Sequence, residues 1–191
     1  MTDIGLMSYY LRIKIKQGED GIFMNQEKFA RGIIKKFKIK DYAKVNTLVE
    51  YGVKMSKNNE REKINSTIFK NLVGSLRYLT CTHRDILYRV GLVSRFMETP
   101  TMTHFKALKW ILRYIKGTVD FGLFYDDSNS FDLVGYSNSD WDRDMDDINI
   151  TTGFIFYLGD TTFIWSSKKQ FIFILSTCEN EYVVVFVIPY G

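Results

Sequence analysis

Leu133-Val134-Gly135-Tyr136-Ser137-Asn138-Ser139-Asp140-Trp141 is the stretch that decides the fold of the C-terminal part of this sequence. Its apolar beginning predicts a β-strand over residues 131–136, and small polar and acidic side chains follow at the strand's end. Such an end can form a two-metal site, because Mg²⁺ prefers oxygen ligands and two ions can stabilise both oxygens of an in-line displacement. At the critical turn this sequence has Asn138, whose side chain carries no charge.

Further short strands are predicted on both sides of this stretch. They cover residues 121–125, 153–158 and 162–166, and Gly159-Asp160 predicts a hairpin turn between the last two. The polar segment 126–130 predicts a linker, and we place a domain boundary there.

A short helix is predicted near the C-terminal end, capped by Ser176 or Thr177 and carrying Glu179 and Glu181. A carboxylate on this helix that faces the 131–136 strand would give the geometry that a magnesium nuclease requires. Acidic residues are also typical of a first helical turn, because they interact favourably with the helix dipole. The pattern leaves both interpretations open.

Two other kinds of site are excluded in this region. The alternating aspartates from Asp140 to Asp146 suggest a calcium-binding loop, but that loop needs Gly at its sixth and Glu at its twelfth position. This sequence has Met145 and Thr151 there. The serines beside Asn138 have neither an adjacent histidine nor the glycine pattern of a nucleophile elbow, which excludes a serine hydrolase.

The N-terminal part begins with a predicted β-hairpin. Residues 8–17 alternate in the manner of a half-buried strand, with Leu11, Ile13 and Ile15 on one face and Arg12, Lys14 and Lys16 on the other. Turn residues 18–21 then lead into a second apolar strand. The hairpin is therefore expected to have a basic outer face.

Four helices are predicted to follow, over residues 26–38, 66–80, 84–97 and from beyond Pro100 to Gly117. Asn25 and Thr103 are the predicted caps of the first and the last. The apolar stripe of the second helix consists of Phe69, Leu72, Val73, Leu76 and Leu79.

The last of these helices carries a second, basic stripe at steps of three and four residues: Lys106, Lys109, Arg113 and Lys116. A row of cations at this spacing could contact successive phosphates and gain affinity through counterion release. The alternative is an ordinary solvated helix face.

Charge is distributed unevenly along the 191 residues. Residues 1–120 contain 23 Lys and Arg against 11 Asp and Glu, whereas residues 121–191 contain 3 against 11, for a net charge of +4 overall. Such asymmetry favours a polyanionic partner for the first part and cation binding by the second. No stretch has the pattern of a signal peptide or spans a membrane, so an intracellular, non-secreted protein without a membrane partner is expected.

The two cysteines and two histidines show no spacing typical of metal ligands. Cys81 and Cys178 are interpreted as packed thiols rather than as a disulfide. His83 and His104 are expected at the surface or at helix caps.

At several motifs the sequence resembles the Pol polyprotein of copia-type retrotransposons, from the end of the reverse transcriptase into the ribonuclease H domain. The motifs that carry the resemblance are Ser8-Tyr9-Tyr10-Leu11, Gln26-Glu27-Lys28-Phe29, Leu72-Val73-Gly74-Ser75-Leu76-Arg77-Tyr78-Leu79-Thr80, Ser94-Arg95-Phe96-Met97, Trp110-Ile111-Leu112-Arg113-Tyr114-Ile115-Lys116-Gly117-Thr118, Thr151-Thr152-Gly153-Phe154, Trp165-Ser166-Ser167-Lys168-Lys169-Gln170 and Leu175-Ser176-Thr177.

The resemblance implies that the basic hairpin is similar to a primer grip and that the helices to Gly117 are similar to a thumb and connection. Phosphate contact then becomes the favoured interpretation of the basic helix. The resemblance also implies a ribonuclease H domain, in which Glu181 matches a metal-binding glutamate and Asn138 stands where the first metal-binding aspartate is expected. A third carboxylate is expected beyond Gly191, and the polymerase aspartates before Met1.

The expected fold is α+β: a helical thumb and connection with an N-terminal hairpin over residues 1–125, then a truncated, mixed ribonuclease H-like sheet with one helix over 131–191. We expect a polyprotein fragment without activity of its own, which binds primer-template or an RNA/DNA hybrid and associates with other retroelement proteins. A binding module without catalysis is one alternative. Residual ribonuclease H activity, with magnesium held by Glu181 and with Asp140 in place of Asn138, is another.

Overall fold

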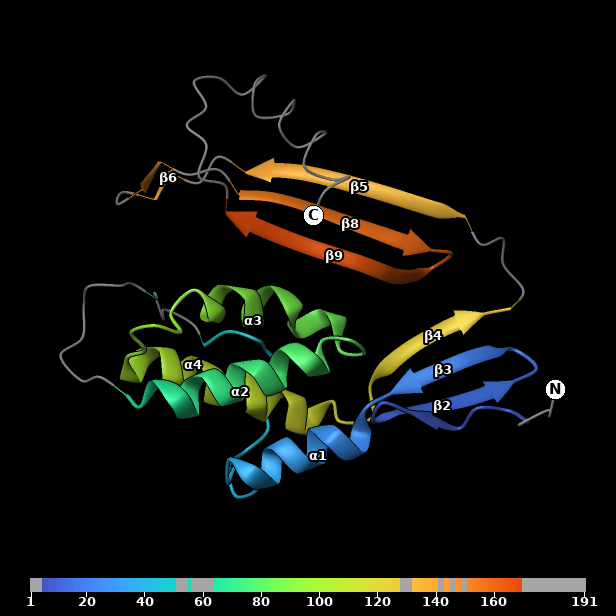
Figure 1. The fold of residues 1–191 in the computed structure, drawn as a ribbon, viewed down its shortest axis with the longest axis horizontal. Helices are drawn as coiled ribbons and strands as arrows, with labels where there is room; N and C mark the ends of the chain where they lie inside the picture. Colours follow the sequence, from blue (N-terminus) through green and yellow to red (C-terminus); the bar gives the residue numbers. More distant parts are fainter. Residues whose placement is uncertain are drawn as a thin grey trace. The chain divides into compact units, whose positions relative to one another are not determined.

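The computed structural model describes residues 5–50, 55, 64–127, 132–140, 143–144, 147–148 and 151–169. The chain forms two compact units, Met1–Asp127 and Ser128–Gly191, and the division falls within the predicted linker. The described residues form an α+β structure with four α-helices and an antiparallel main sheet in each unit (Figure 1). None of the described helices is both long enough and apolar enough to cross a membrane.

The sheet of the first unit has the strand order β1-β2-β3-β4. β2 (Ile13–Gly18) and β3 (Gly21–Asn25) form the predicted hairpin, and Gly18 pairs with Gly21 across its turn. The strand predicted over residues 8–17 is not continuous. It is broken by a tight turn at Leu11–Arg12, so that β1 (Tyr9–Tyr10) folds back on β2.

β4 (Gly122–Asp126), which comes from the C-terminal end of the unit's sequence, is the last strand of this sheet. It pairs antiparallel with β3 along its whole length, from Gly21 opposite Asp126 to Asn25 opposite Gly122. The sequence predicted the strand but not its partner. The chain between β3 and β4 contains all four described helices (Figure 1).

The four helices have the bounds Glu27–Lys36 (α1), Ser66–Leu79 (α2), Leu87–Ser94 (α3, preceded by a 3₁₀ turn) and Met102–Gly117 (α4). Two predicted caps are wrong. Gln26 rather than Asn25 precedes α1, without a side-chain capping bond, and Thr101 rather than Thr103 caps α4. α2 is capped by Asn65, whose side-chain oxygen accepts hydrogen bonds from the two backbone amides at the helix start.

The hydrophobic core of the first unit lies between these helices. The stripe predicted for α2 is confirmed, because all five of its residues are fully buried. The other buried members of the core are Ala30, Ile33, Ile34, Ile39, Ile86, Val90, Val93, Leu108, Ile111, Leu112 and Ile115. Burial of apolar area on this scale is the main term that holds the four helices together.

Both histidines are buried, so the expected surface position is wrong, whereas the expected position at a helix cap is confirmed for His104. His104 forms a capping box with Thr101 at the start of α4, and its ring stacks on Phe96 with centroids 3.9 Å apart. His83 forms a 2.8 Å hydrogen bond between its Nε2 and the Thr118 carbonyl. Cys81 is exposed, which corrects its assignment as a packed thiol.

A polar contact joins α4 to the 3₁₀ turn. The Tyr114 hydroxyl donates a 2.6 Å hydrogen bond to the Asp85 carboxylate. Burial, the hydrogen bond to Asp85 and the negative charge of Asp85 together raise the pKa of Tyr114 to about 12.

This pKa predicts a loss of stability in strong alkali. The folded protein holds the Tyr114 proton up to about pH 12, whereas an unfolded chain loses it near pH 10. The stabilising contribution is therefore complete below pH 10 and lost as the pH rises through 12. Urea unfolding at several pH values should show a shallower alkaline decline for Tyr114→Phe than for the wild type. Parallel declines would contradict this assignment.

The sheet of the second unit has the strand order β5-β8-β9, and all its pairings are antiparallel in the described part. Its strands are β5 (Leu133–Asp140), β8 (Thr151–Leu158) and β9 (Thr161–Lys169), and the predicted Gly159-Asp160 turn connects the last two. Two short strands, β6 (Arg143–Asp144) and β7 (Asp147–Ile148), pair with each other. The expected mixed sheet is not observed among these strands, and the predicted helix lies outside the described residues.

Candidate nucleic-acid interface

The outer face of the β2–β3 hairpin is basic, as the alternation predicted. Lys14 and Lys16 are exposed on β2, while Ile13 and Ile15, which alternate with them, are half-buried. Arg12 is also exposed but lies in the turn before β2 rather than on the strand. Of the three predicted cations of this segment, Lys14 and Lys16 therefore lie on the strand and Arg12 lies in the turn.

Arg12 lies at a groove between the β1–β2 turn, α1 and α2. The groove has a volume of about 380 Å³ and is lined by Tyr9, Arg12, Lys28, Phe29, Gly32, Ile33, Lys36 and Ser75. The Arg12 guanidinium lies 5.4 Å from the centre of the Phe29 ring, within the range of a cation–π contact. We call this feature the basic groove, because it contains three cations and no acidic side chain.

Lys28 and Lys36 are groove residues that the sequence predictions of the interface missed. They lie two turns apart on α1, with Gly32 between them, so one helix face presents both ammonium groups on either side of a position without a side chain. The spacing of eight residues was visible in the sequence. No sequence pattern indicated the turn at Arg12. Arg12 meets Lys28 and Lys36 only in the folded chain.

The basic row of α4 has partners within the protein. Arg113 Nε donates to the Ala43 carbonyl at 2.7 Å, and Lys116 Nζ donates to two carbonyls, those of Lys40 at 2.5 Å and Tyr42 at 2.9 Å. Lys109 lies 5.0 Å from the centre of the Phe105 ring. These three side chains therefore bind residues 40–43 or stack on an aromatic ring.

Lys106 differs from the rest of the row because it is exposed and makes none of these contacts. Trp110 of α4 also bonds to the connecting chain, because its Nε1 donates to the Thr47 carbonyl at 2.8 Å. Hydrogen bonds to carbonyls leave the charges of Arg113 and Lys116 in place, so phosphate contact by α4 stays a prediction.

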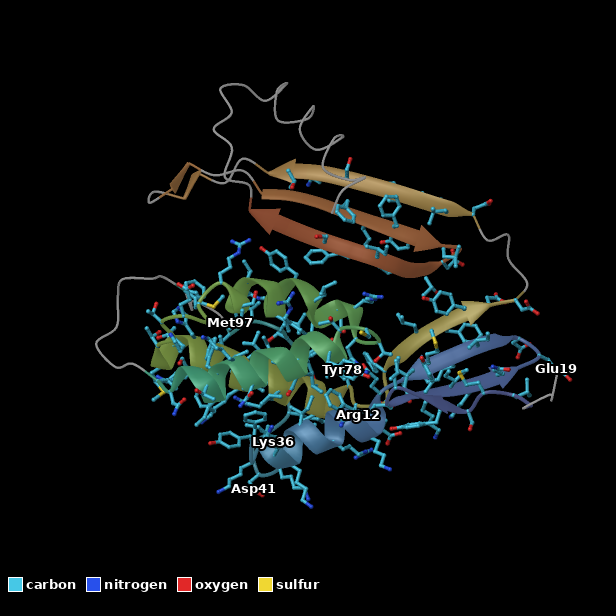
Figure 2. The ribbon with its side chains drawn as sticks, in the orientation of Figure 1. Arg12, Glu19, Lys36, Asp41, Tyr78 and Met97 are labelled. Carbon is cyan, nitrogen blue, oxygen red and sulfur yellow. The ribbon has the colours of Figure 1, made fainter. Side chains whose placement is uncertain are left out.

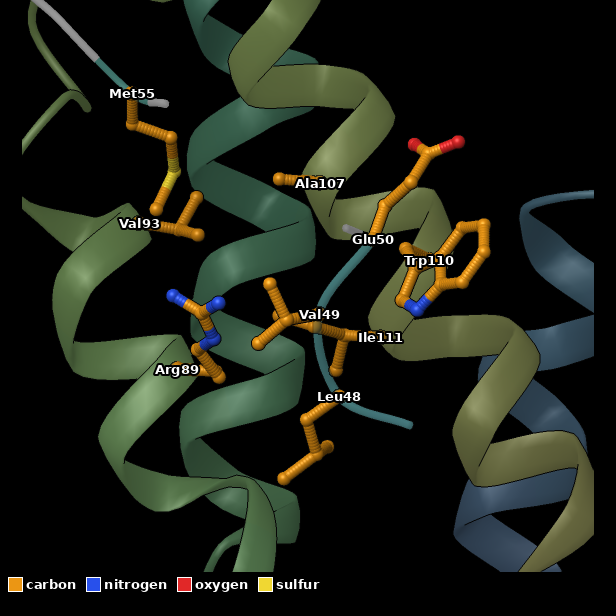
Figure 3. Close-up of a pocket in the computed structure, with 9 residues that line it drawn as sticks. All are labelled: Leu48, Val49, Glu50, Met55, Arg89, Val93, Ala107, Trp110 and Ile111. Carbon is orange, nitrogen blue, oxygen red and sulfur yellow. The ribbon is translucent and has the colours of Figure 1, made fainter. Parts of the chain in front are cut away.

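A small apolar cavity lies beneath residues 48–50, against α3 and α4 (Figure 3). It is lined by Leu48, Val49, Glu50, Met55, Arg89, Val93, Ala107, Trp110 and Ile111. Its volume of about 30 Å³ is close to that of a single water molecule. We therefore assign no ligand to it.

In the second unit Asn138 lies inside a strand rather than at a strand tip. β5 continues to Asp140, and Asn138 pairs with Gly153 of β8. Asn138 is exposed, and Asp140 lies two residues along the same strand, opposite Thr151.

Asn138 differs chemically from the ligand that a two-metal site needs at its position. Asn138 would offer a neutral amide oxygen, whereas two Mg²⁺ ions are usually held by carboxylates. The structure describes only the backbone of Asp140, and Glu181 lies outside the described residues. Within the described ranges no cluster of three His, Cys, Asp or Glu side chains could hold a metal ion. The magnesium site of Glu181 and Asp140 therefore stays a prediction.

Comparisons with known proteins are consistent across most of the chain. It is 36% identical over 176 residues to the retrovirus-related Pol polyprotein from transposon RE1 of Arabidopsis thaliana, and 34% identical over 192 residues to that from transposon TNT 1-94 of Nicotiana tabacum. These matches cover 92% and 96% of this chain but only 12% and 14% of the polyproteins.

A shorter relative matches over most of its own length. An uncharacterized mitochondrial protein of Arabidopsis thaliana is 34% identical over 182 residues, which cover 95% of this chain and 75% of that protein. No protein-family model and no solved structure matches the chain. The chain therefore belongs to the family of copia-type retrotransposon Pol polyproteins and corresponds to a short segment of them.

Proposed function

We propose that this chain is a nucleic-acid-binding segment of a retrotransposon Pol protein, equivalent to a reverse-transcriptase thumb and connection followed by part of a ribonuclease H domain. The basic groove is the observation that carries this proposal. Arg12, Lys28 and Lys36 converge there beside the aromatic rings of Tyr9 and Phe29. Cations contact phosphates and rings can contact sugars or bases, so this combination suits an RNA/DNA hybrid or a primer-template.

The hairpin adds two further exposed cations to the proposed interface. Lys14 and Lys16 are exposed on β2, which follows directly from the Arg12 turn. Cations on neighbouring elements can neutralise several phosphates of one backbone, and each neutralised phosphate releases counterions. In this proposal the groove and the hairpin form the main contact, and Lys106 and Lys109 of α4 add to it.

We further propose that the chain binds without cutting. A neutral amide at position 138 removes one negative charge from the place where the family resemblance implies a metal-binding aspartate. Two-metal catalysis depends on such charges to hold both ions near the scissile phosphate. Incubation of the purified chain with Mg²⁺ and an RNA/DNA hybrid should therefore leave the RNA intact. Cleavage that disappears in Glu181→Gln would overturn this part of the proposal.

Salt-dependent binding tests the proposed interface. The affinity for a labelled RNA/DNA hybrid should fall steeply with salt, and Lys28→Gln/Lys36→Gln should reduce the slope of log K against log [salt] by about 1.8 if both lysines contact phosphates. Lys70→Gln, which removes an exposed cation elsewhere on α2, should leave the slope unchanged.

The same assay tests the contribution of α4. Lys106→Gln/Lys109→Gln removes two charges while keeping the Arg113 and Lys116 bonds to residues 40–43. A reduced slope would support phosphate contact by α4, and an unchanged slope would confine the interface to the groove and hairpin. Salt-independent binding by the wild type, or no binding, would reject the proposed function.

A further inference from the structure

The turn that carries Arg12 has an unfavourable backbone conformation. Tyr9 pairs with Lys14 and Tyr10 with Ile13, so Leu11 and Arg12 are the two central residues of a tight hairpin turn. Both have positive φ angles, 43° and 61°. Turns of this kind favour Gly, Asn or Asp, and a bulky residue adopts a left-handed conformation only where its surroundings hold it there.

Tyr78 of α2 stabilises this turn conformation. Its hydroxyl donates a hydrogen bond to the Leu11 carbonyl, which joins two residues 67 positions apart. Its ring packs edge-on against Phe29, with centroids 5.0 Å apart and an interplanar angle of 82°. Figure 2 shows Tyr78 and Arg12 where the N-terminal sheet meets the helices.

The Phe29 ring connects this contact to Arg12. Phe29 contacts both the Tyr78 ring and the Arg12 guanidinium, which lies 5.4 Å from the Phe29 centroid. Arg12 shares the groove with Lys28 and Lys36, and like charges repel one another. A mobile turn would let Arg12 move away from the two lysines into solvent.

We propose that Tyr78 is a positioning residue, whose hydroxyl fixes the Leu11–Arg12 turn and thereby places Arg12 in the basic groove to contact a nucleic-acid phosphate. This inference rests on the proposed function. Tyr78 itself need not touch nucleic acid, because it acts through the Leu11 carbonyl. The substitution Tyr78→Phe keeps the ring against Phe29 and removes only the hydroxyl, so it separates positioning from packing.

The first experiment measures hybrid binding against salt for the full chain. Arg12→Gln should reduce the slope by about 0.9, the value for one phosphate contact, and Tyr78→Phe should reduce it by a similar amount. The double variant should be no weaker than Arg12→Gln alone, because both changes remove the same contact. Additive losses, or an unchanged slope in Tyr78→Phe, would overturn the proposal.

Rescue provides the second test. Asn tolerates a left-handed conformation far better than Leu, so Leu11→Asn should hold the turn without help from Tyr78. The double variant Leu11→Asn/Tyr78→Phe should recover the slope that Tyr78→Phe loses. A purely structural role of Tyr78 in the core would give no such recovery, and its absence would count against positioning.

Limited trypsin digestion measures how accessible the Leu11–Arg12 turn is, without any nucleic acid. Tyr78→Phe should speed cleavage after Arg12 relative to cleavage after Lys40, which Tyr78 does not contact, and Leu11→Asn should slow it again. Equal cleavage rates in wild type and Tyr78→Phe would overturn the positioning role itself. If Tyr78→Phe speeds cleavage but the wild-type chain binds no hybrid, the positioning role stands and the proposed function is rejected. The proposed contact between Arg12 and a phosphate is then rejected as well.

Discussion

Replacing Phe69 by Ala should lower the free energy of unfolding of the first unit by about 3–5 kcal/mol. Phe69 is fully buried at the centre of the helical core, and the substitution removes an aromatic side chain where the neighbouring helices can close the space only partly. Denaturant unfolding followed by helical circular dichroism measures the change. Because small domains are only marginally stable, this variant should be largely unfolded at moderate temperature.

Ile68→Ala is the matched control for this prediction. Ile68 precedes Phe69 on α2, but 47% of its surface is exposed. Its truncation removes little buried area and introduces a better helix former, so the change should stay within about 0.5 kcal/mol. A loss below about 1 kcal/mol for Phe69→Ala, or equal losses for both variants, would contradict the packing described for α2.

Replacing Gly21 by Ala should cost about 3 kcal/mol, from backbone strain together with a steric clash. Gly21 has a φ of 139°, a value that residues with a side chain rarely adopt. An added Cβ would overlap the Tyr125 carbonyl oxygen and lie 3.0 Å from the Asp126 Cα. Since Gly21 pairs with Asp126, the clash falls directly on the β3–β4 ladder.

The local signature of this variant should be faster hydrogen exchange along β4, which loses its only described neighbouring strand when the ladder opens. Gly74→Ala is the control with the opposite sign. Gly74 lies on the exposed side of α2, and a methyl group added there would meet no neighbouring atom within 4 Å. Ala should stabilise α2 by about 0.5–1 kcal/mol at this position. Similar stability for both variants would contradict the β4 pairing.

The interface predictions show where charge patterns in the sequence are informative. The alternation in residues 13–16 correctly put Lys14 and Lys16 on the exposed face of a strand. The row on α4 was equally regular, yet Arg113 and Lys116 bind carbonyls of residues 40–43. A helical period tells which residues share a face. It does not tell which other segment of the chain covers that face.

Local sequence patterns by themselves determined the positions of the four described helices, the buried stripe of α2 and the β2–β3 hairpin. These features depend on side-chain period and turn residues within a few positions, which the sequence displays directly. The same period failed at Leu11–Arg12, because neither residue favours a left-handed turn and nothing nearby signals one.

Only the tertiary structure decided the rest: the pairing of β4 with β3, the left-handed Leu11–Arg12 turn, and the meeting of Arg12 with Lys28 and Lys36 in one groove. Each depends on segments that are far apart in the sequence, such as Tyr78 and Leu11. Such long-range contacts form only when the whole unit folds around its core. Their energy comes from residues distant in the sequence, which a local pattern does not identify.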